Sequence, residues 1–179
     1  NKSNAQLVLS LVEALGLDKA KALAGLKSFP GTWRRMEYKG KTINNVPVYD
    51  DYGHHPREIK ATYEALREKY TKGDHKIVML FQPHLYSRTK ALLSEFVDVL
   101  KDVDEVYILP IYRARLEDTS VINEGIVRDS INKLGGNAKV VDSLSDIPQI
   151  IESITDERSV IVNMGAGNAF EEVNKVKFA

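Results

Sequence analysis

The chain has 179 residues, of which 43% are hydrophobic and 28% are charged, as expected for a globular protein with one main core. Its 25 basic and 25 acidic residues give a formal net charge of zero, so no broad positive field favours nucleic acid or an anionic membrane as a partner. The absence of cysteine excludes disulfides, thiolate metal sites and a cysteine nucleophile, and it fits a cytoplasmic protein.

The sequence also argues against a membrane protein and against a secreted one. No window reaches the roughly 18 continuous apolar residues that a membrane span needs, and the N-terminus lacks the basic-then-apolar pattern of a signal peptide. Because the chain starts at Asn1 rather than Met, we expect it to be a fragment or a processed product.

Two short helices are predicted at the N-terminus. Apolar residues recur at helical spacing over residues 4–15, and Gly16 supplies a stop. Asp18 can cap a second helix that runs to about Ser28. Residues 29–33 then break the helical pattern, and we place the domain boundary there.

The rest of the chain predicts an α/β fold. A hairpin is expected first, with an extended segment at 33–38, a turn at Lys39-Gly40 and a strand at 42–49. Short apolar runs then alternate with helical periods, which is typical of a sheet with crossover helices. The expected strands are 77–81, 105–109, 138–141 and 159–164, and the expected helices include 59–70, 92–100, 122–134 and 147–154. Because the strands are apolar on both faces, we predict a doubly wound, mostly parallel sheet with helices on both faces, preceded by the short helical segment.

A first polar segment follows the predicted hairpin and reads Asp-Asp-Tyr-Gly-His-His-Pro over residues 50–56. Ligand sites of open α/β sheets lie directly after strands. Carboxylates beside imidazoles can bind a metal, accept ribose hydroxyls or hold a small polar substrate. The alternative is a turn whose histidines cap a helix beginning at Pro56. A zinc site is disfavoured because adjacent histidines seldom ligate one ion.

A second polar segment reads Phe-Gln-Pro-His-Leu-Tyr-Ser-Arg-Thr over residues 81–89, again after a strand and before a helix. Arg88 can bind a carboxylate or a phosphate in bidentate fashion, and free N–H groups at the helix start favour an anion. The alternative is a polar helix entry that Ser87 caps.

Two further segments carry weaker signals. Arg34 and Arg35 are expected on a strand near the domain boundary, where arginines are often only surface residues. The Gly-Ala-Gly sequence at 165–167 can form a phosphate-binding turn, although a tight turn is favoured because the full dinucleotide-binding spacing is missing. No P-loop, serine elbow or H-E-x-x-H motif is present, so the chain is not expected to hydrolyse ATP alone.

The order of these segments resembles the C-terminal part of the Mur ligases, above all their alanine-adding branch. Residues 1–5 are similar to the family's H-N-x-x-N-A helix start without its His, and residues 81–89 are similar to the F-Q-P-H-x-[YF]-S-R-T signature. The Arg34–Glu37, 50–56 and 164–167 segments also match, so the resemblance covers nearly the whole chain. Residues 111–115 match only loosely, Leu85 stands where some relatives have a second arginine, and Asn168 where many have Asp.

The resemblance implies a division of the chain and an activity. Residues 1–32 would be the last helices of a central ATP-binding domain, and residues 33–179 a Rossmann-like, amino-acid-binding C-terminal domain. The implied reaction adds L-alanine to UDP-N-acetylmuramate through an acyl phosphate, in peptidoglycan precursor synthesis. ATP and Mg²⁺ would serve the full-length enzyme. This fragment would be inactive alone, because the P-loop, the metal ligands and the UDP-sugar site are absent from it.

The resemblance also implies residue roles on the ATP side of the site. Asn1 and Asn4 match asparagines that hydrogen-bond adenine. Arg35 matches an arginine near the ATP phosphates, and Asp51 matches the carboxylate that accepts the ribose hydroxyls.

On the amino-acid side, Tyr52, His54, His84 and Arg88 match residues around the incoming L-alanine. Arg88 is the natural partner for its carboxylate. His54 or His84 would act catalytically by holding or deprotonating the attacking amine, and the sequence does not decide between them.

Two alternatives stay open at this point. A ligase that recycles a whole tripeptide shares the 50–56 segment, although the Q-P-H-x-Y-S-R-T string favours the alanine-adding branch. The other alternative is a non-catalytic α/β module that binds a nucleotide or an amino acid. An open reading frame that starts near Asn1 would favour the module, and one extending about 300 residues upstream would favour the ligase.

Overall fold

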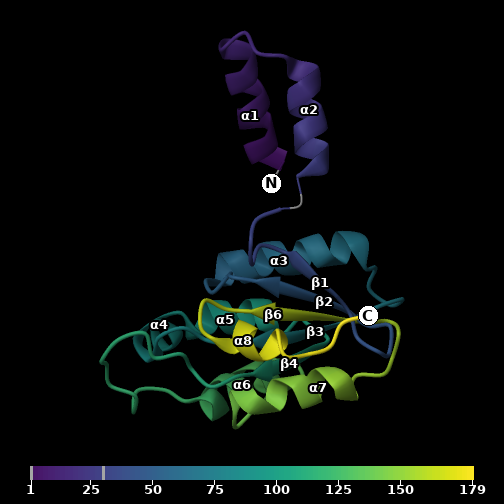
Figure 1. The fold of residues 1–179 in the computed structure, drawn as a ribbon. Coiled ribbons are helices and arrows are strands. Elements are labelled where there is room, and N and C mark those ends of the chain that lie inside the picture. The colour runs from purple at the N-terminus through teal and green to yellow at the C-terminus, as the bar shows by residue number, and fades with distance from the viewer. Residues whose placement is uncertain (1, 30) are drawn as a thin grey trace. The chain divides into compact units, whose positions relative to one another are not determined.

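The computed structural model describes residues 2–29 and 31–179, which form two compact units, 1–32 and 33–179 (Figure 1). The first unit contains the two predicted helices, α1 (Lys2–Ala14) and α2 (Lys19–Ser28). The Asp18 carboxylate caps α2 by accepting hydrogen bonds from the backbone N–H groups of Ala20 and Lys21, at 2.8 and 3.1 Å.

The second unit is a six-stranded sheet with helices. Its elements are, in chain order, β1 (Glu37–Lys41), β2 (Pro47–Asp51), α3 (Pro56–Lys69), β3 (Lys76–Phe81), α4 (Tyr86–Ala91), α5 (Leu93–Leu100), β4 (Glu105–Ile108), α6 (Glu124–Lys133), β5 (Ala138–Val140), the 3₁₀ turn η1 (Leu144–Asp146), α7 (Ile147–Ser153), β6 (Ser159–Met164) and α8 (Ala169–Val173). The strand order is β1-β2-β6-β3-β4-β5, and only the β1–β2 pair is antiparallel. The predicted α/β fold with a mostly parallel sheet is confirmed.

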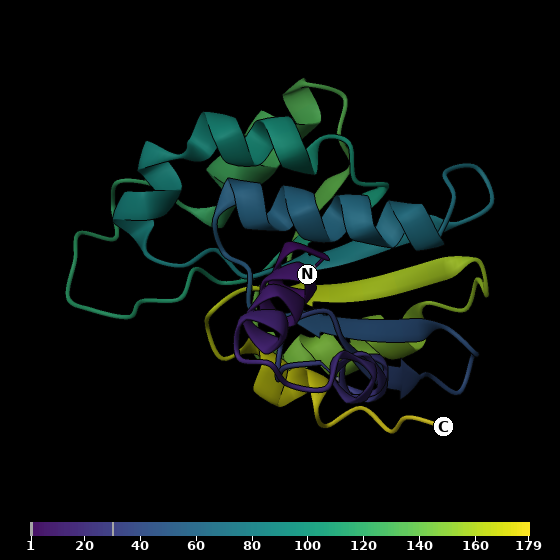
Figure 2. The same ribbon diagram turned by 90° about the horizontal axis from the view of Figure 1, so that it is seen from above.

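Hydrophobic clusters cover both faces of the sheet, as the two-sided apolar strands predicted. On one face, Ile77 and Met79 of β3 belong to the cluster that α3, α5 and α6 cover. On the other face, Val78 and Leu80 belong to the cluster that α7 and α8 cover. Figure 2 shows α3 and α8 on opposite sides of the strands. The alternation along β3 is the period-2 alternation of a strand buried on both sides.

The hairpin forms, but the predicted position of its turn is wrong. The chain reverses after Thr42, where the N–H of Thr42 donates to the carbonyl of Val46 at 2.9 Å and Asn45 has a φ of 62°. Asparagine tolerates this left-handed conformation, so it marks the turn. Gly40 lies inside β1 instead, at a register shift between Tyr38 and Gly40, with a φ of 129°.

The expected strand at residues 33–38 is also wrong over its first four residues, 33–36. Trp33 and Arg34 form a turn, the next two residues form a bend, and β1 begins only at Glu37. Arg34 and Met36 both have positive φ values, 52° and 50°. These values are uncommon for residues other than glycine. The side chain of Arg34 is held by the buried contacts described below, and the N–H of Met36 donates to Asp51 Oδ2 at 2.8 Å.

The topology brings the predicted site segments to one edge of the sheet. Asp51, at the end of β2, pairs in register with Met164 at the end of β6, and Met164 pairs with Phe81 at the end of β3. The segments that follow these strands therefore start side by side, as expected for the carboxyl ends of parallel strands. No helix in the described ranges is both long and apolar enough to cross a membrane.

Candidate functional site

Side chains from the segments that follow three different strands meet at this edge of the sheet. Tyr52 and His54 follow β2, His84 and Arg88 follow β3, and Tyr112 follows β4. The ring centroids of Tyr52 and His54 are 5.6 Å apart, those of His54 and His84 are 5.4 Å apart, and those of His84 and Tyr112 are 5.5 Å apart. We call these five residues the carboxyl-edge site. The structure thus brings together all four residues that were predicted to surround an amino acid, and it adds Tyr112.

The backbone fixes the position of His84. Leu85 donates its N–H to the carbonyl of Tyr112 at 2.9 Å, and Tyr112 donates its N–H to the carbonyl of Pro83 at 2.8 Å. Leu85 has a φ of 69°, and its side chain is buried. The buried side chain of Leu85 therefore holds its own backbone in an uncommon conformation next to His84. This conformation sets the direction in which α4, with Arg88, begins.

The contact between Arg88 and His84 defines the proton positions on His84. Arg88 Nη1 lies 3.4 Å from His84 Nδ1, and because a guanidinium only donates, Nδ1 acts as the acceptor. Burial, followed by the positive charge of Arg88, lowers the pKa of His84, so its imidazole is neutral at neutral pH. The remaining proton is then on Nε2, which can donate to a ligand.

The two adjacent histidines divide their roles. His55 caps α3, since its Nδ1 accepts a hydrogen bond from Arg57 N, and the His55 backbone N–H donates to the Glu58 carboxylate. His54 instead packs against His84, and its Nδ1 lies 3.2 Å from the carbonyl of Tyr52. A carbonyl only accepts, so this nitrogen carries the proton in a neutral His54 and Nε2 keeps a lone pair.

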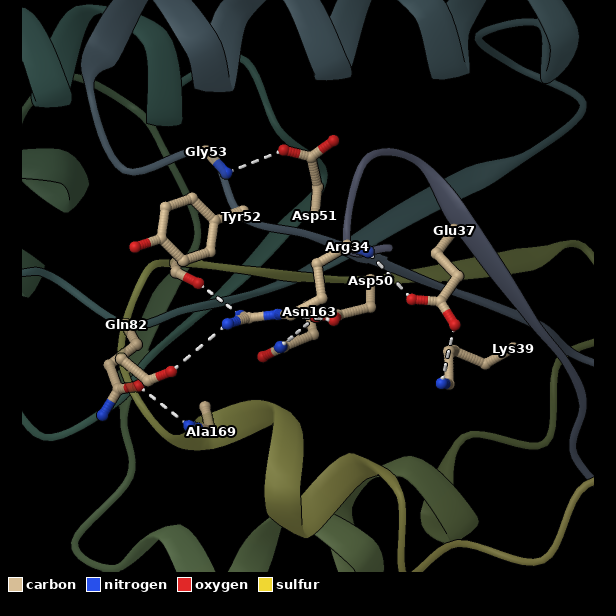
Figure 3. Close-up of polar contacts among 12 residues, drawn as sticks. Arg34, Glu37, Lys39, Asp50, Asp51, Tyr52, Gly53, Gln82, Asn163 and Ala169 are labelled. Carbon is tan, nitrogen blue, oxygen red and sulfur yellow. Dashed lines mark hydrogen bonds and ion pairs between the residues drawn. The ribbon is translucent and has the colours of Figure 1, made fainter. Parts of the chain in front are cut away.

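Arg34, which the sequence suggested was a surface residue, is the buried centre of the polar network drawn in Figure 3. Its Nε donates to Asp50 Oδ2 at 2.8 Å, and its Nη2 and Nη1 donate to the carbonyls of Gly165 and Gly167 at 2.5 and 3.4 Å. Asn163 Nδ2 donates to the other oxygen of Asp50 at 2.6 Å. The guanidinium thus ties the turn after β6 to the end of β2.

The Gly-Ala-Gly segment is a tight turn packed against Gln82. Gln82 Oε1 accepts a hydrogen bond from Ala169 N at 2.9 Å, and Gln82 Nε2 donates to Asn168 Oδ1 at 3.2 Å. A Cβ added at Gly167 would stand 2.3 Å from Gln82 Oε1, and one at Gly165 would stand 2.7 Å from the carbonyl oxygen of Gln82. The close approach of the turn to the backbone and side chain of Gln82 therefore explains both glycines, and it accounts for Gln82 in the second polar segment.

The residues predicted on the ATP side are more dispersed. Asn1 lies outside the described residues, and Asn4 is exposed on α1 in the first unit. Arg35 is exposed, whereas Asp51 is only 8% exposed and accepts backbone hydrogen bonds from Met36 and Gly53, each at 2.8 Å. Burial raises the pKa of Asp51. Each carboxylate oxygen keeps a second lone pair, so the predicted ribose contact stays a prediction.

The prediction that the N–H groups at the start of α4 are free is wrong, because the Glu117 carboxylate already accepts hydrogen bonds from them. Its carboxylate accepts from the backbone N–H groups of Tyr86 and Ser87, at 2.8 and 3.1 Å, and from the Ser87 hydroxyl at 2.7 Å. Ser87 is therefore not the helix cap; Glu117, 30 residues along the chain, takes that part.

The carboxylates beside the site are committed to structural contacts. The Asp50 oxygens bond Arg34 and Asn163, and the Asp51 oxygens bond two backbone N–H groups. Among residues 2–29 and 31–179, no three His, Asp or Glu side chains are grouped so that they could hold a metal ion. The five side chains of the carboxyl-edge site offer imidazole, phenol and guanidinium groups for hydrogen bonding.

Comparison with known proteins identifies the family. The family described as Mur ligase, glutamate ligase domain, matches residues 34–167. A UDP-N-acetylmuramate–L-alanine ligase from Agathobacter rectalis is 42% identical over 171 residues, covering 96% of this chain and 36% of the relative. The chain thus spans about a third of the length of such relatives.

Solved structures of Mur ligases share the fold of this chain. The UDP-N-acetylmuramate-alanine ligase from Thermotoga maritima superposes with a TM-score of 0.79 at 29% identity, covering 96% of this chain and 35% of that one. A domain of a putative UDP-N-acetylmuramate:L-alanyl-gamma-D-glutamyl-diaminopimelate ligase from Haemophilus ducreyi has a TM-score of 0.57 at 28% identity, covering 79% of this chain and 95% of that one. The family match over three-quarters of the chain, the shared fold and the shared sequence show that this chain belongs to the Mur ligase family.

Proposed function

We propose that this chain is the C-terminal part of an ATP-dependent ligase that joins L-alanine to UDP-N-acetylmuramate. The observation that carries the proposal is the grouping of His54, His84 and Arg88 within one small site at the carboxyl edge of the sheet. Relatives at about 40% identity that carry the name of this ligase support it. The UDP-sugar site and the P-loop would belong to the rest of a longer chain.

In the proposed site, Arg88 and His84 bind the carboxylate of L-alanine. Arg88 supplies a positive charge and a planar set of donors that match a carboxylate. His84 supplies its Nε2–H, because its Nδ1 faces Arg88. The neutral state of His84 suits this role, since a neutral imidazole donates to the substrate without placing a second positive charge beside Arg88.

His54 is then the better candidate to take a proton from the amine. An α-ammonium group has no lone pair and cannot attack an acyl phosphate, so it must lose a proton first. His54 Nε2 keeps a lone pair because Nδ1 faces the carbonyl of Tyr52, and His54 lies beside His84 in the same site. The geometry thus favours His54 as the base and His84 as a carboxylate ligand, a choice that the sequence left open.

The proposed reaction follows the usual order for an acyl phosphate. ATP transfers its γ-phosphoryl group to the muramoyl carboxylate, the amine of L-alanine attacks the acyl carbon, and phosphate leaves. The carboxyl-edge site contributes by positioning the amine and by limiting the access of water to the acyl phosphate. Its own residues make no bond to phosphorus.

The nucleotide contacts belong to the same proposal. Asn1, Asn4, Arg35 and Asp51 are proposed to contact adenine, the phosphates and the ribose in the full-length protein. Magnesium would accompany ATP and neutralise phosphate charge. Because the described residues hold no group of three His, Asp or Glu side chains that could bind a metal ion, we propose that its protein ligands lie in the rest of the protein.

Phosphate release by the full-length protein tests this function. The assay contains ATP, Mg²⁺ and UDP-N-acetylmuramate, and it receives L-alanine, glycine, L-serine or a stem tripeptide in turn. The proposal predicts release stimulated chiefly by L-alanine. Stimulation by the tripeptide alone would assign the chain to the recycling ligases, and no stimulation by any of them would favour a non-catalytic binding module.

A further inference from the structure

A second cleft lies at the opposite edge of the sheet from the carboxyl-edge site. It has a volume of about 490 Å³ and is bordered by the amino ends of β2 and β6, near Pro47 and Ser159, and by the end of α3. Strand β2 has five residues, so about 16 Å of strand separates the two edges. None of the residues that line this cleft belongs to the carboxyl-edge site.

The cleft has an aromatic wall. Tyr38, Tyr49 and Tyr70 line it, with ring centroids 5.3 Å apart for Tyr38 and Tyr49 and 6.2 Å apart for Tyr49 and Tyr70. Tyr49 is buried, whereas Tyr38 is 53% exposed. A wall of this kind offers ring faces and edges to a flat ligand.

The cleft also holds positive charge without a carboxylate partner. Lys69 Nζ donates to the Tyr49 hydroxyl at 2.7 Å and lies 5.2 Å from the ring centroid of Tyr70. Lys41 Nζ donates to Asn45 Oδ1 at 2.7 Å. Within the ranges that the structure describes, neither lysine forms an ion pair with a carboxylate, and the acidic residue on the lining, Glu157, is exposed.

The neighbouring phenol does not neutralise Lys69. Burial and the hydrogen bond with Tyr49 raise the pKa of Tyr70 to about 12, so this hydroxyl keeps its proton at neutral pH. The hydrogen bond to Tyr49 raises the pKa of Lys69, so its side chain stays an ammonium. The aromatic wall therefore carries a fixed positive charge that an anion can neutralise.

His75 adds an imidazole to the lining of the cleft. It lines the cleft and packs against Tyr70, with ring centroids 5.3 Å apart. Its Nδ1 is buried and has no hydrogen-bond partner among the described residues. An unpaired buried nitrogen is unfavourable, so His75 would gain from a hydrogen bond with a polar group of a ligand.

We propose that this cleft binds a small planar ring that carries one anionic group, a phosphate or a carboxylate. The ring would lie against Tyr38 and Tyr70, and the anion would pair with Lys69 and Lys41. Glu157, an exposed residue of the lining, would disfavour ligands that carry a second anionic group. The site is separate from the proposed ligase chemistry, and its ligand need not take part in that reaction.

A binding titration of the ¹⁵N-labelled chain, residues 1–179, tests the proposal. Phenyl phosphate and benzoate are the probes, and phenol and inorganic phosphate are the controls that carry only the ring or only the anion. We expect a saturable shift of the amide signals of Tyr49, Tyr70 and Ser159 with at least one of the two ring anions. Phenol and phosphate should each bind at least about tenfold more weakly, because each loses one half of the contact.

Matched lysine variants locate the binding. Lys69→Met keeps the length of the side chain and removes its charge, and Lys41→Met does the same on β1, so each should weaken the ring anion about tenfold. Lys60→Met, on the same helix α3 but outside this cleft, should leave binding unchanged. The amide spectrum of each variant shows that it is folded.

Three results would overturn the proposal. They are the absence of saturable shifts up to about 10 mM of both ring anions, shifts that map to His84 and Arg88 instead, and binding that both Lys69→Met and Lys41→Met leave intact. A preference for phenyl phosphate over benzoate, or the reverse, would decide which anion the site takes. Because the readout is binding to this chain, it does not depend on ligase activity.

Discussion

Arg34 and Asp50 form an ion pair of 2.8 Å although their side chains are only 2% and 3% exposed. Both side chains make further hydrogen bonds, since Arg34 also donates to two glycine carbonyls and Asp50 also accepts from Asn163. The ring of Phe170 adds a contact, with Arg34 Cζ 4.3 Å from its centroid. The pair joins the loop before β1 to the end of β2, and the other hydrogen bonds of Arg34 join that loop to the turn after β6.

Removing Arg34 should therefore be costly. Arg34→Met leaves the Asp50 carboxylate buried without its cation, and we expect the free energy of unfolding to fall by about 3–5 kcal/mol. Urea denaturation of the wild-type and variant chains measures the difference. Arg35→Met is the matched control, because Arg35 is exposed, and it should change stability by less than about 0.5 kcal/mol. Equal effects of the two variants would contradict the structural role of Arg34.

His84 should titrate below an ordinary histidine. Burial and then the charge of Arg88 lower its pKa from 6.5, so the folded chain binds this proton less tightly than the unfolded chain does. Protonation of His84 therefore opposes folding as the pH falls below about 6.5. An NMR titration of the His84 ring measures the midpoint, which should rise in Arg88→Met. Lys90→Met, which removes a charge from the same helix, should leave it unchanged, and a midpoint insensitive to Arg88→Met would contradict the assigned contact.

Glu105 should contribute stability that is lost in acid. Burial alone would raise its pKa, but hydrogen bonds from Lys139, at 2.6 Å, and from Lys76 outweigh burial and lower the pKa to about 2. A lowered pKa gives stability that is present above the unfolded value of 4.5 and is lost as the pH falls from there towards 2.

Denaturation of Glu105→Gln and wild type at several pH values checks this expectation. The stability difference between them should be largest near pH 7 and should shrink between about pH 4.5 and pH 2. A stability difference that stays constant down to pH 2 would show that the two lysines do not hold Glu105 ionised.

Replacing His54 should slow the reaction of the full-length protein in a pH-dependent way. If His54 Nε2 takes the proton of the amine, His54→Gln should lower kcat with L-alanine by roughly 10²–10⁴-fold near neutral pH. The loss should become smaller at higher pH, because the free amine then forms without a base. The pH profile of phosphate release measures this, and a loss that is the same at every pH would indicate that His54 only fills space.

The fold could be predicted from the sequence because its signals are local. The run Ile77–Phe81 is apolar on both faces, and the helix starts at Asp18 and Pro56 carry their own capping chemistry. The hairpin turn was misplaced because Lys39-Gly40 has turn-forming residues, whereas the actual turn depends on Asn45 and on the Thr42–Val46 bond. The pairing of β1 with β2 fixes the turn at residues 42–46 rather than at Lys39-Gly40.

The site could be predicted only in part, because its other contacts join residues far apart in the chain. Arg34 and Asp50 are 16 residues apart and Arg34 and Gly165 are 131 apart, so nothing local marks Arg34 as buried. Asp50, which follows the apolar residues of a predicted strand, was the one indication of a buried cation nearby, since a buried carboxylate needs a partner. Glu117 carried no such signal, because it lies in a loop and meets α4 only in the folded chain.

The kinetics of the Arg88→Ala variant of the full-length protein test most directly whether the carboxyl-edge site binds the amino acid. The measurement is the KM for L-alanine and the KM for ATP, each at saturating concentrations of the other substrates. Loss of a charge-assisted, bidentate contact should raise the KM for L-alanine by roughly tenfold to a hundredfold and leave the KM for ATP within about threefold. An unchanged KM for L-alanine, or a selective defect for ATP, would contradict the account.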